Sequence, residues 1–155
     1  MKERMDYRKA APDALKAMLQ VETYARRSGL EHSLLELVKY RASQINGCAF
    51  CMDMHTKDAR AAGETEQRLY TLSAWRECPY YSDRERAALA WTEAVTEIAR
   101  DGVPDAIYEQ AREQFSEKEL VDLTMAVVAI NGWNRLAISF HALPGKYQPG
   151  DYKDK

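Results

Sequence analysis

Hydrophobic residues recur at intervals of three and four along most of the chain, which is the periodicity of amphipathic helices. The clearest stripe precedes an Asn-Gly pair at positions 46 and 47, and its apolar members are Leu34, Leu35, Val38, Ala42 and Ile45. No stretch alternates with a period of two for long enough to form a strand. The pattern therefore predicts an all-α fold.

Prolines, glycines and capping residues mark where the helices should begin and end. Ser82 with Glu85, and Ser116 with Glu119, have the spacing of capping boxes. Gly132 lies inside the last and most apolar pattern and is expected to kink it, and a Pro-Gly pair at 144–145 should end it. The helices expected from these signals start or stop near Pro12, Gly29, Glu31, Gly47, Gly63, Thr65, Cys78, Ser82, Gly102, Pro104, Ala111, Ser116 and Pro144.

We expect a single helical domain over residues 12–145, built from six to eight helices. Residues 1–11 would form an N-terminal extension and residues 146–155 a loose polar tail. A chain of 155 residues is long enough to bury a real core without a metal or disulfide.

Charge and hydropathy exclude several classes of partner. Charged residues make up 30% of the chain and the formal net charge is -2, so no basic stripe suits nucleic acid or an anionic membrane. The first nine residues lack an apolar signal region, and no stretch approaches the roughly 18 apolar residues of a membrane span. We expect a cytoplasmic protein with no nucleic-acid or membrane partner.

The most reactive side chains cluster between positions 46 and 55. If a helix begins just after Gly47, then Cys48, Cys51 and His55 share one helix face. Glu36, on the preceding helix, could bring a carboxylate to the same site. In a reducing compartment a Cys-x-x-Cys pair indicates redox or metal chemistry more than a structural disulfide.

Thiol chemistry gives each of these residues a use. A thiolate that attacks a peroxide becomes a sulfenic acid, and a second thiol can then condense with it to a disulfide. His55 could carry the proton, and Glu36 could orient the imidazole. Position favours Cys48 as the more acidic thiol, because it faces the positive end of the helix dipole, whereas Cys51 has His55 one turn away.

These residues resemble a known family. Glu36 followed by Asn-Gly-Cys-Ala-Phe-Cys-Met-Asp-Met-His at 46–55 is similar to the alkylhydroperoxidase D-like branch of the carboxymuconolactone decarboxylase family. The segment Leu-Ala-Ile-Ser-Phe-His-Ala-Leu-Pro-Gly at 136–145 looks like the same branch. The resemblance implies an all-helical fold assembled as trimers or hexamers, with peroxidase activity on hydrogen peroxide and alkyl hydroperoxides.

By that resemblance Cys51 is the peroxidatic thiol, Cys48 resolves it, and Glu36 with His55 relays protons. A dithiol or protein electron donor is required, and no cofactor. Phe50 stands where better-known members carry a second histidine between the cysteines, which shortens the relay and makes the mouth of the pocket more apolar.

The cysteine motif has three other interpretations. A zinc site needs a fourth ligand, and Cys78, His32 and His141 lack the pair spacing of structural zinc sites, so we expect no metal. A redox sensor or general disulfide oxidoreductase could use the same disulfide. Decarboxylation of a lactone, which the family name suggests, gives no reason for paired cysteines.

The other notable residues are expected to have structural roles. We expect Cys78 to be a buried apolar residue and His32 to lie on the surface. We expect the three tryptophans to lie in the core or at a subunit interface.

Overall fold

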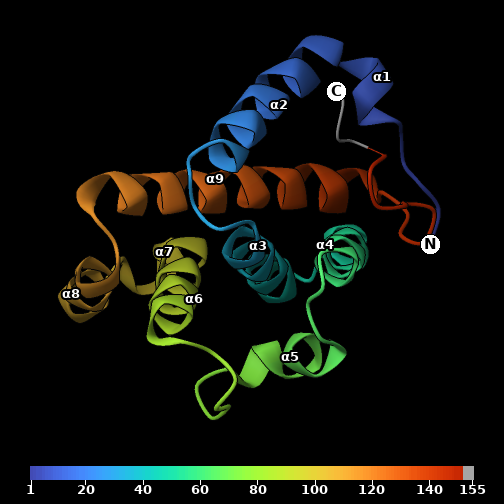
Figure 1. Ribbon diagram of the computed structural model, residues 1–155. Helices are drawn as coiled ribbons and strands as arrows, with labels where there is room; N and C mark the ends of the chain where they lie inside the picture. Colours follow the sequence, from blue (N-terminus) through green and yellow to red (C-terminus); the bar gives the residue numbers. More distant parts are fainter. Residues whose placement is uncertain (152–155) are drawn as a thin grey trace.

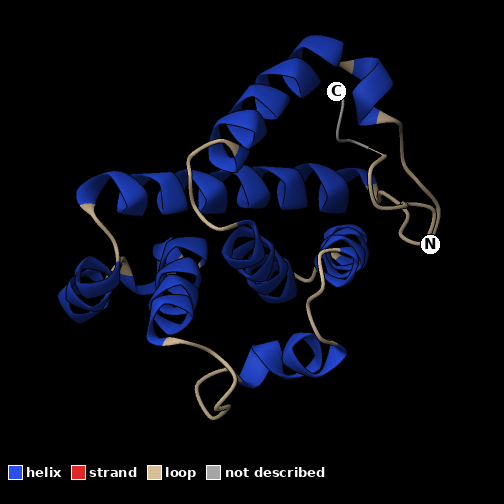
Figure 2. Ribbon diagram, viewed as in Figure 1, coloured by secondary structure: helices blue, strands red, loops and turns tan. Residues whose placement is uncertain are grey.

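The computed structural model describes residues 1–151. The described residues form helices and loops with no strand (Figure 2), which confirms the all-α prediction. The two shortest helices, α1 and α7, bring the number of α-helices within this range to nine, above the six to eight expected. The elements are α1 (Tyr7–Ala10), α2 (Pro12–Arg26), α3 (His32–Asn46), α4 (Ala49–Ala61), α5 (Glu66–Thr71), a 3₁₀ turn (Leu72–Ala74), α6 (Asp83–Thr96), α7 (Ile98–Asp101), α8 (Asp105–Gln114) and α9 (Glu117–Phe140).

The longest helix, α9, runs across the middle of the molecule (Figure 1). Helices α1 and α2 lie on one side of it, and α3, α4, α6 and α8 lie on the other, with α5 beyond them. Fully buried leucines of α3, α6 and α9 form the centre of the core: Leu35, Leu37, Leu89 and Leu123. Because α9 packs against the helices on both of its sides, it holds α3 and α4 in position.

The predicted helix starts are confirmed in detail. Pro12 is the first residue of α2, where its missing N–H has no intrahelical partner to lose. Both capping boxes form: the Ser82 hydroxyl accepts from the Glu85 amide, and Ser116 accepts from Glu119. In each box the glutamate side chain accepts from the serine amide in return.

The expectations for Gly132 and for the end of α9 are wrong. Helix α9 is continuous from Glu117 to Phe140, and it ends where His141 adopts a left-handed φ of 55°, before Pro144. A Cβ on Gly132 would lie 2.6 Å from Met18 Cε. The glycine therefore permits close packing of α2 against α9 instead of bending α9.

Both ends of the described chain pack against the helices. Tyr7 is buried, and the Arg4 amide donates to the Phe140 carbonyl at 3.0 Å. Tyr147 is also buried, and its hydroxyl donates to the Asp58 carboxylate at 2.7 Å. A loose tail is therefore the wrong description for Tyr147, while residues 152–155 of that expected tail lie outside the described residues.

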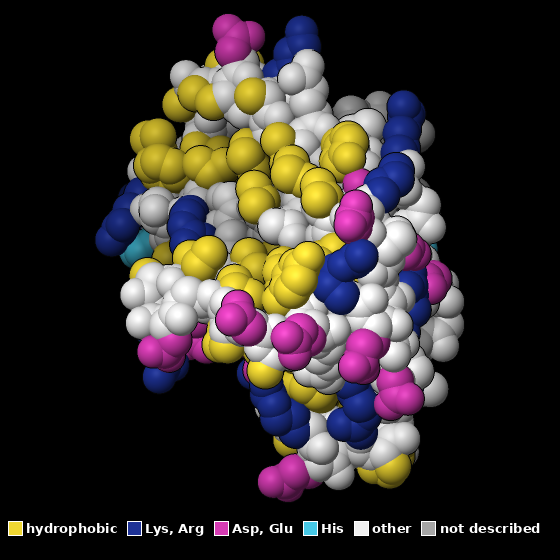
Figure 3. Space-filling view, turned by 90° about the vertical axis from the view of Figure 1, so that its left-hand side faces the viewer, with side chains coloured by type: hydrophobic (Ala, Val, Ile, Leu, Met, Phe, Trp, Pro, Cys, Tyr) yellow, Lys and Arg dark blue, Asp and Glu magenta, His cyan; other side chains and the backbone are white. Residues whose placement is uncertain are grey.

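The surface is mixed in character. On the face drawn in Figure 3, hydrophobic side chains gather in the upper half, and charged side chains are more frequent below and at the edges. Among residues 1–151, no helix is both long enough and apolar enough to cross a bilayer.

Candidate active site

The turn between α3 and α4 sets the positions of the two thiols. Gly47 adopts a left-handed φ of 69°, and its amide donates to the Gln44 carbonyl while the Cys48 amide donates to the Ser43 carbonyl. Glycine takes this conformation at no steric cost, so α3 can end abruptly and the chain can reverse. Cys48 becomes the N-cap of α4, and Cys51 lies in its first turn.

Both cysteines of the motif are free thiols, and each is only 1% exposed. They approach each other to 3.0 Å, so a small movement would bring the sulfurs to the ~2.05 Å of a disulfide. Their access differs, because Cys51 lines a cavity and Cys48 does not. Small molecules in the cavity therefore meet Cys51 first.

The order of acidity of the two thiols is the reverse of their order of access to the cavity. The pKa of Cys48 is lowered to about 7, because a hydrogen bond from the Cys51 thiol outweighs the effect of burial. The pKa of Cys51 is raised, because Cys51 donates that hydrogen bond and is itself buried. Helix position led to the same order of acidity. Cys48 is therefore the more acidic thiol and Cys51 the more accessible one, and a hydrogen bond joins them.

A buried asparagine of α9 completes the surroundings of the thiols. Hydrogen bonding from Asn134 lowers the pKa of both Cys48 and Cys51. Its amide nitrogen donates to the Ser43 hydroxyl at 3.1 Å, and its oxygen accepts from Asn46 at 2.8 Å. Nothing in the local sequence pattern distinguishes Asn134, because its role comes from contact between distant helices.

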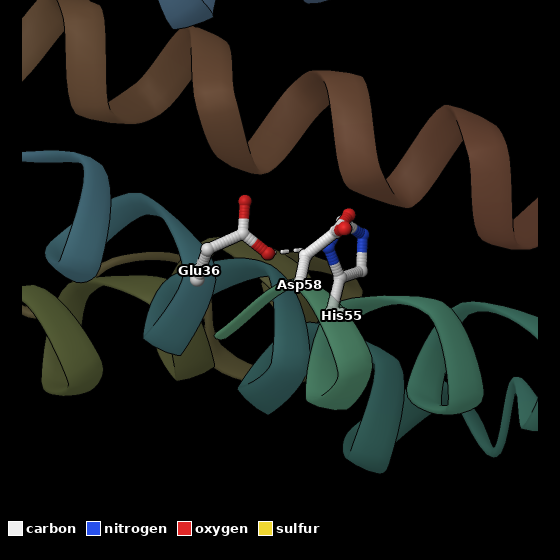
Figure 4. Close-up of side chains that lie close together, drawn as sticks. All are labelled: Glu36, His55 and Asp58. Atoms are coloured by element: carbon white, nitrogen blue, oxygen red, sulfur yellow. Dashed lines mark hydrogen bonds and ion pairs between the residues drawn. The ribbon is translucent and has the colours of Figure 1, made fainter. Parts of the chain in front are cut away.

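Glu36 and His55 form a hydrogen-bonded pair beside the thiols (Figure 4). The Glu36 carboxylate on α3 lies 2.9 Å from His55 Nδ1 on α4, and both residues are buried. Burial raises the pKa of Glu36, but the neighbouring charge and hydrogen bond of His55 outweigh it and lower that pKa to about 2. His55 Nε2 has no hydrogen-bond partner within the described chain, so this ring nitrogen is the one free to exchange a proton.

Asp58 is a third polar residue at this pair, and the sequence analysis did not identify it. Glu36, His55 and Asp58 each offer a ligand atom, and these atoms lie within 4.8 Å of one another, so they could hold a metal ion. However, the Asp58 carboxylate accepts the Tyr147 hydroxyl proton, which lies within hydrogen-bond distance of both its oxygens, and Glu36 already accepts from His55. We interpret the set as an acid–base network, since the carboxylates of Glu36 and Asp58 already have hydrogen-bond partners inside the protein.

The cavity beside these residues has a volume of about 440 Å³. Cys51, His55 and Glu36 all line it, so the structure brings three of the four expected residues to one space with Cys48 directly behind. Phe50 lines it as well, as expected for an apolar mouth. Trp133 is a further lining residue; its indole N–H donates to Glu22 at 3.3 Å, so it is not only a core residue.

The remaining candidates have other surroundings. The His32 side chain is 58% exposed and lies 3.8 Å from the Glu36 carboxylate. His141 is half-buried, and its Nδ1 lies 3.3 Å from the Lys2 carbonyl. Cys78 is half-buried rather than buried as expected, because it follows the helical turn and packs at the edge of a different apolar cluster from the other cysteines.

Comparison with known proteins places these features in a family. The model of the carboxymuconolactone decarboxylase family matches residues 12–94. The Bacillus subtilis protein YdfG is 48% identical over 139 residues, which cover 90% of this chain and 95% of YdfG. Escherichia coli YnjA is 29% identical and is matched over 76% of this chain and 62% of its own.

Solved structures share the fold. The Agrobacterium tumefaciens protein ATU0492, described as a candidate antioxidant defence protein AhpD, is 49% identical with a TM-score of 0.91, covering 94% of this chain and all of that one. A peroxidase-related protein with an alkylhydroperoxidase core from Ralstonia eutropha reaches a TM-score of 0.79 at 19% identity, covering 90% of this chain and 75% of its own. The second likeness shows the fold alone.

Proposed function

The chain belongs to the carboxymuconolactone decarboxylase family, in its alkylhydroperoxidase D-like branch, and we propose that it is a thiol-dependent peroxidase. Its substrates would be hydrogen peroxide or organic hydroperoxides. One observation carries the proposal: Cys51 faces a cavity, with Cys48 behind it at 3.0 Å and the Glu36–His55 pair lining the same cavity. The description of the Agrobacterium tumefaciens relative as an antioxidant defence protein AhpD supports it.

In the first step Cys51 attacks the peroxide. A shift of the proton from Cys51 to Cys48 along their hydrogen bond puts the negative charge on the sulfur that faces the cavity. That thiolate attacks one peroxide oxygen, the O–O bond breaks, and Cys51 becomes a sulfenic acid. The Glu36–His55 pair supplies a proton to the leaving alkoxide or hydroxide, which departs as an alcohol or water.

In the second step Cys48 resolves the sulfenic acid. Its sulfur attacks Cys51, the S–O bond breaks, and hydroxide leaves as water by taking the Cys48 proton. The two electrons lost by the thiols have passed to the peroxide, which is reduced to alcohol or water, and the thiols are left oxidised as a disulfide. A dithiol or protein donor returns two electrons and two protons, is itself oxidised to a disulfide, and regenerates the site.

Two other functions use parts of the same site. A redox sensor or general disulfide oxidoreductase would form the same disulfide without rapid turnover of peroxide. Lactone decarboxylation would use Glu36 and His55 but would have no need for Cys48 or Cys51. The paired thiols at the cavity favour the peroxidase over both.

We propose that the protein works as a homo-oligomer of three or six chains. Apolar side chains stand exposed on α9, where Val121 is 58% and Val128 is 48% exposed. Tyr24 of α2 lies beside them, because its hydroxyl donates to Asp122 at 2.8 Å. Burying this apolar surface against another copy would remove it from water.

Peroxide consumption with dithiothreitol as donor tests the peroxidase. The wild type should turn over, Cys51→Ser should lose activity by at least about a hundredfold because the nucleophile is removed, and Cys78→Ser, the matched control, should behave as wild type. Cys48→Ser, treated with peroxide in the absence of dithiothreitol, should react once and leave a sulfenic acid at Cys51 that mass spectrometry detects. A chelator should leave the rate unchanged, because the mechanism uses thiols alone. Absence of turnover in the wild type would overturn the proposal, and full activity in Cys51→Ser would overturn the role of that thiol.

A further inference from the structure

The cavity is elongated, with the thiols at one end. Along α4 its lining begins at Phe50 and continues to Ala61, which at about 1.5 Å per residue is about 16 Å. Along α2 the lining follows one helix face, at Leu15, Leu19, Glu22, Thr23 and Arg26, over a similar length. Three residues of α3 add a third wall: His32, Glu36 and Lys39.

The ends of the cavity are identified by the course of the chain. His32 is the first residue of α3, whereas Cys48 is separated from its last residue, Asn46, only by Gly47, so His32 and Cys48 lie at opposite ends of that helix. Tyr7, just before α2, packs in the same apolar cluster as Cys51. The N-terminal end of α2 therefore lies near the thiols, and Arg26, in its last turn, lies at the far end beside the start of α3.

Most charged groups of the cavity are already paired inside the protein. The Glu22 carboxylate accepts from Lys39 at 2.5 Å and from Trp133, and the Glu36 carboxylate accepts from His55. The third carboxylate of the cavity wall, that of Asp58, accepts from the Tyr147 hydroxyl.

The Arg26 guanidinium is different. Residue 26 is exposed, and its side chain has no hydrogen bond or ion pair with any residue in the range 1–151. Glu22 lies one turn earlier on the same face, but its two oxygens are taken by Lys39 and Trp133. The far end of the cavity therefore presents an unneutralised cation to whatever the cavity holds.

The wall between the thiols and Arg26 is largely apolar. Besides the paired charges, it includes Leu15, Leu19, Met54, Ala61, Ala62 and Trp133. We propose that the cavity selects organic hydroperoxides that carry a carboxylate remote from the peroxide on a hydrocarbon body, with Arg26 binding the carboxylate while the peroxide meets Cys51. This inference rests on the proposed peroxidase function and deepens it. A guanidinium can bind a carboxylate through two parallel hydrogen bonds, which fixes orientation as well as charge.

A second cation, Arg8, lies at the thiol end, over the rings of Tyr7 and Phe50. Binding of the carboxylate there would place the hydrocarbon body in the reverse direction and hold the peroxide away from Cys51. The test therefore centres on Arg26.

The experiment compares linoleic acid hydroperoxide with its methyl ester, which differ only in the charge of the head group. The wild type should show a kcat/KM about tenfold higher for the acid, because the charge-assisted hydrogen bond to Arg26 is lost with the ester. Arg26→Gln should bring that ratio close to one, and Arg26→Lys should restore part of it. Arg27→Gln is the matched control, since Arg27 is the exposed neighbour that does not line the cavity, and it should keep the wild-type ratio. Hydrogen peroxide, too small to span the cavity, should be reduced at the same rate by all four proteins.

Calorimetric titration with the corresponding hydroxy acid and its methyl ester separates this inference from the peroxidase proposal, because binding needs no turnover. The acid should bind the wild type about tenfold more tightly than the ester, and Arg26→Gln should remove the difference. If the wild type binds the acid selectively but consumes no peroxide, the peroxidase proposal fails and the anion site stands. If acid and ester are equivalent in the wild type, or Arg26→Gln leaves their ratio unchanged, the anion site is overturned even in an active peroxidase.

Discussion

Among single residues, Glu36 shows most clearly how burial and pairing combine. The carboxylate is buried between α3 and α4, where an unpaired charge would be costly. The His55 hydrogen bond and the nearby Lys39 charge reverse that cost and hold the pKa at about 2. The carboxylate therefore stays ionised at every pH at which the protein would work, and it can hold the imidazole in one orientation.

A pH dependence of stability follows from Glu36. Because its folded-state pKa is lowered from 4.5 to about 2, its contribution is fully present above about pH 4.5 and is lost as the pH falls through about 2. Glu36→Gln should therefore be less stable than the wild type at pH 7, and the gap should narrow between about pH 4.5 and 2. Urea denaturation of both proteins at pH 7 and pH 3 measures the gap. A gap of the same size at both values would show that the ion pair does not stabilise the fold.

The proximity of Glu36, Cys48, Cys51 and His55 could be predicted from sequence because spacing on one helix, and position on the helix before it, are local properties. The places of Asn134 and Tyr147 could not, because each acts through a partner far along the chain. Trp133 has the apolar neighbours of a core residue, and only its contact with Glu22 shows that it belongs to the cavity wall. Local sequence patterns do not predict such contacts between distant residues.

At the level of elements, the turn at Gly47 matters most, because the end of α3 and the start of α4 fix the spacing of Glu36 from His55 and of Cys48 from Cys51. The Asn-Gly pair that predicted this break lies where the structure has it. A side chain in the left-handed conformation meets a steric cost that glycine avoids. The site therefore depends on a residue that carries no reactive group.

Gly47→Ala should destabilise the protein by about 1–2 kcal/mol, the cost of a left-handed residue with a Cβ. For a chain of this size that corresponds to a fall in Tm of about 2–8 °C. Gly47→Asn, a residue that tolerates this conformation better, should fall between alanine and the wild type. Thermal unfolding followed by circular dichroism decides the matter, and an unchanged Tm in Gly47→Ala would mean that the turn tolerates a different geometry.

Helix boundaries were predictable where the chemistry of the cap is local, as in the boxes at Ser82 and Ser116. The continuity of α9 through Gly132, and its end at His141, could not be predicted in this way. Gly132 inside a helical pattern is compatible with a kink or with close packing, and only the position of Met18 on α2 distinguishes them. Likewise, a left-handed histidine ended α9 before the Pro-Gly pair could do so.

For the whole molecule, the exposed apolar side chains of α9 and α2 bear on assembly. We expect light scattering after size-exclusion chromatography to give three or six times the chain mass of 17.7 kDa. Introducing charge with Val121→Glu and Val128→Glu together should shift the mass towards that of one chain, because a charge buried at an interface is unfavourable. Ile98→Glu, at an exposed apolar residue of α7, is the control and should leave the mass unchanged. A wild-type mass of one chain would exclude the oligomer.

The burial of Cys48 and Cys51 makes the two halves of the proposed cycle sterically unequal. A peroxide can diffuse through a cavity of about 440 Å³ to reach Cys51, whereas a folded donor protein is far too large to enter. For such a donor to bring its own sulfur into line with the disulfide, the segments around Tyr7 and Tyr147 that line the cavity would have to move aside. A small dithiol needs no such opening. The speed of re-reduction should therefore report on the mobility of the two chain ends, and the speed of oxidation should not.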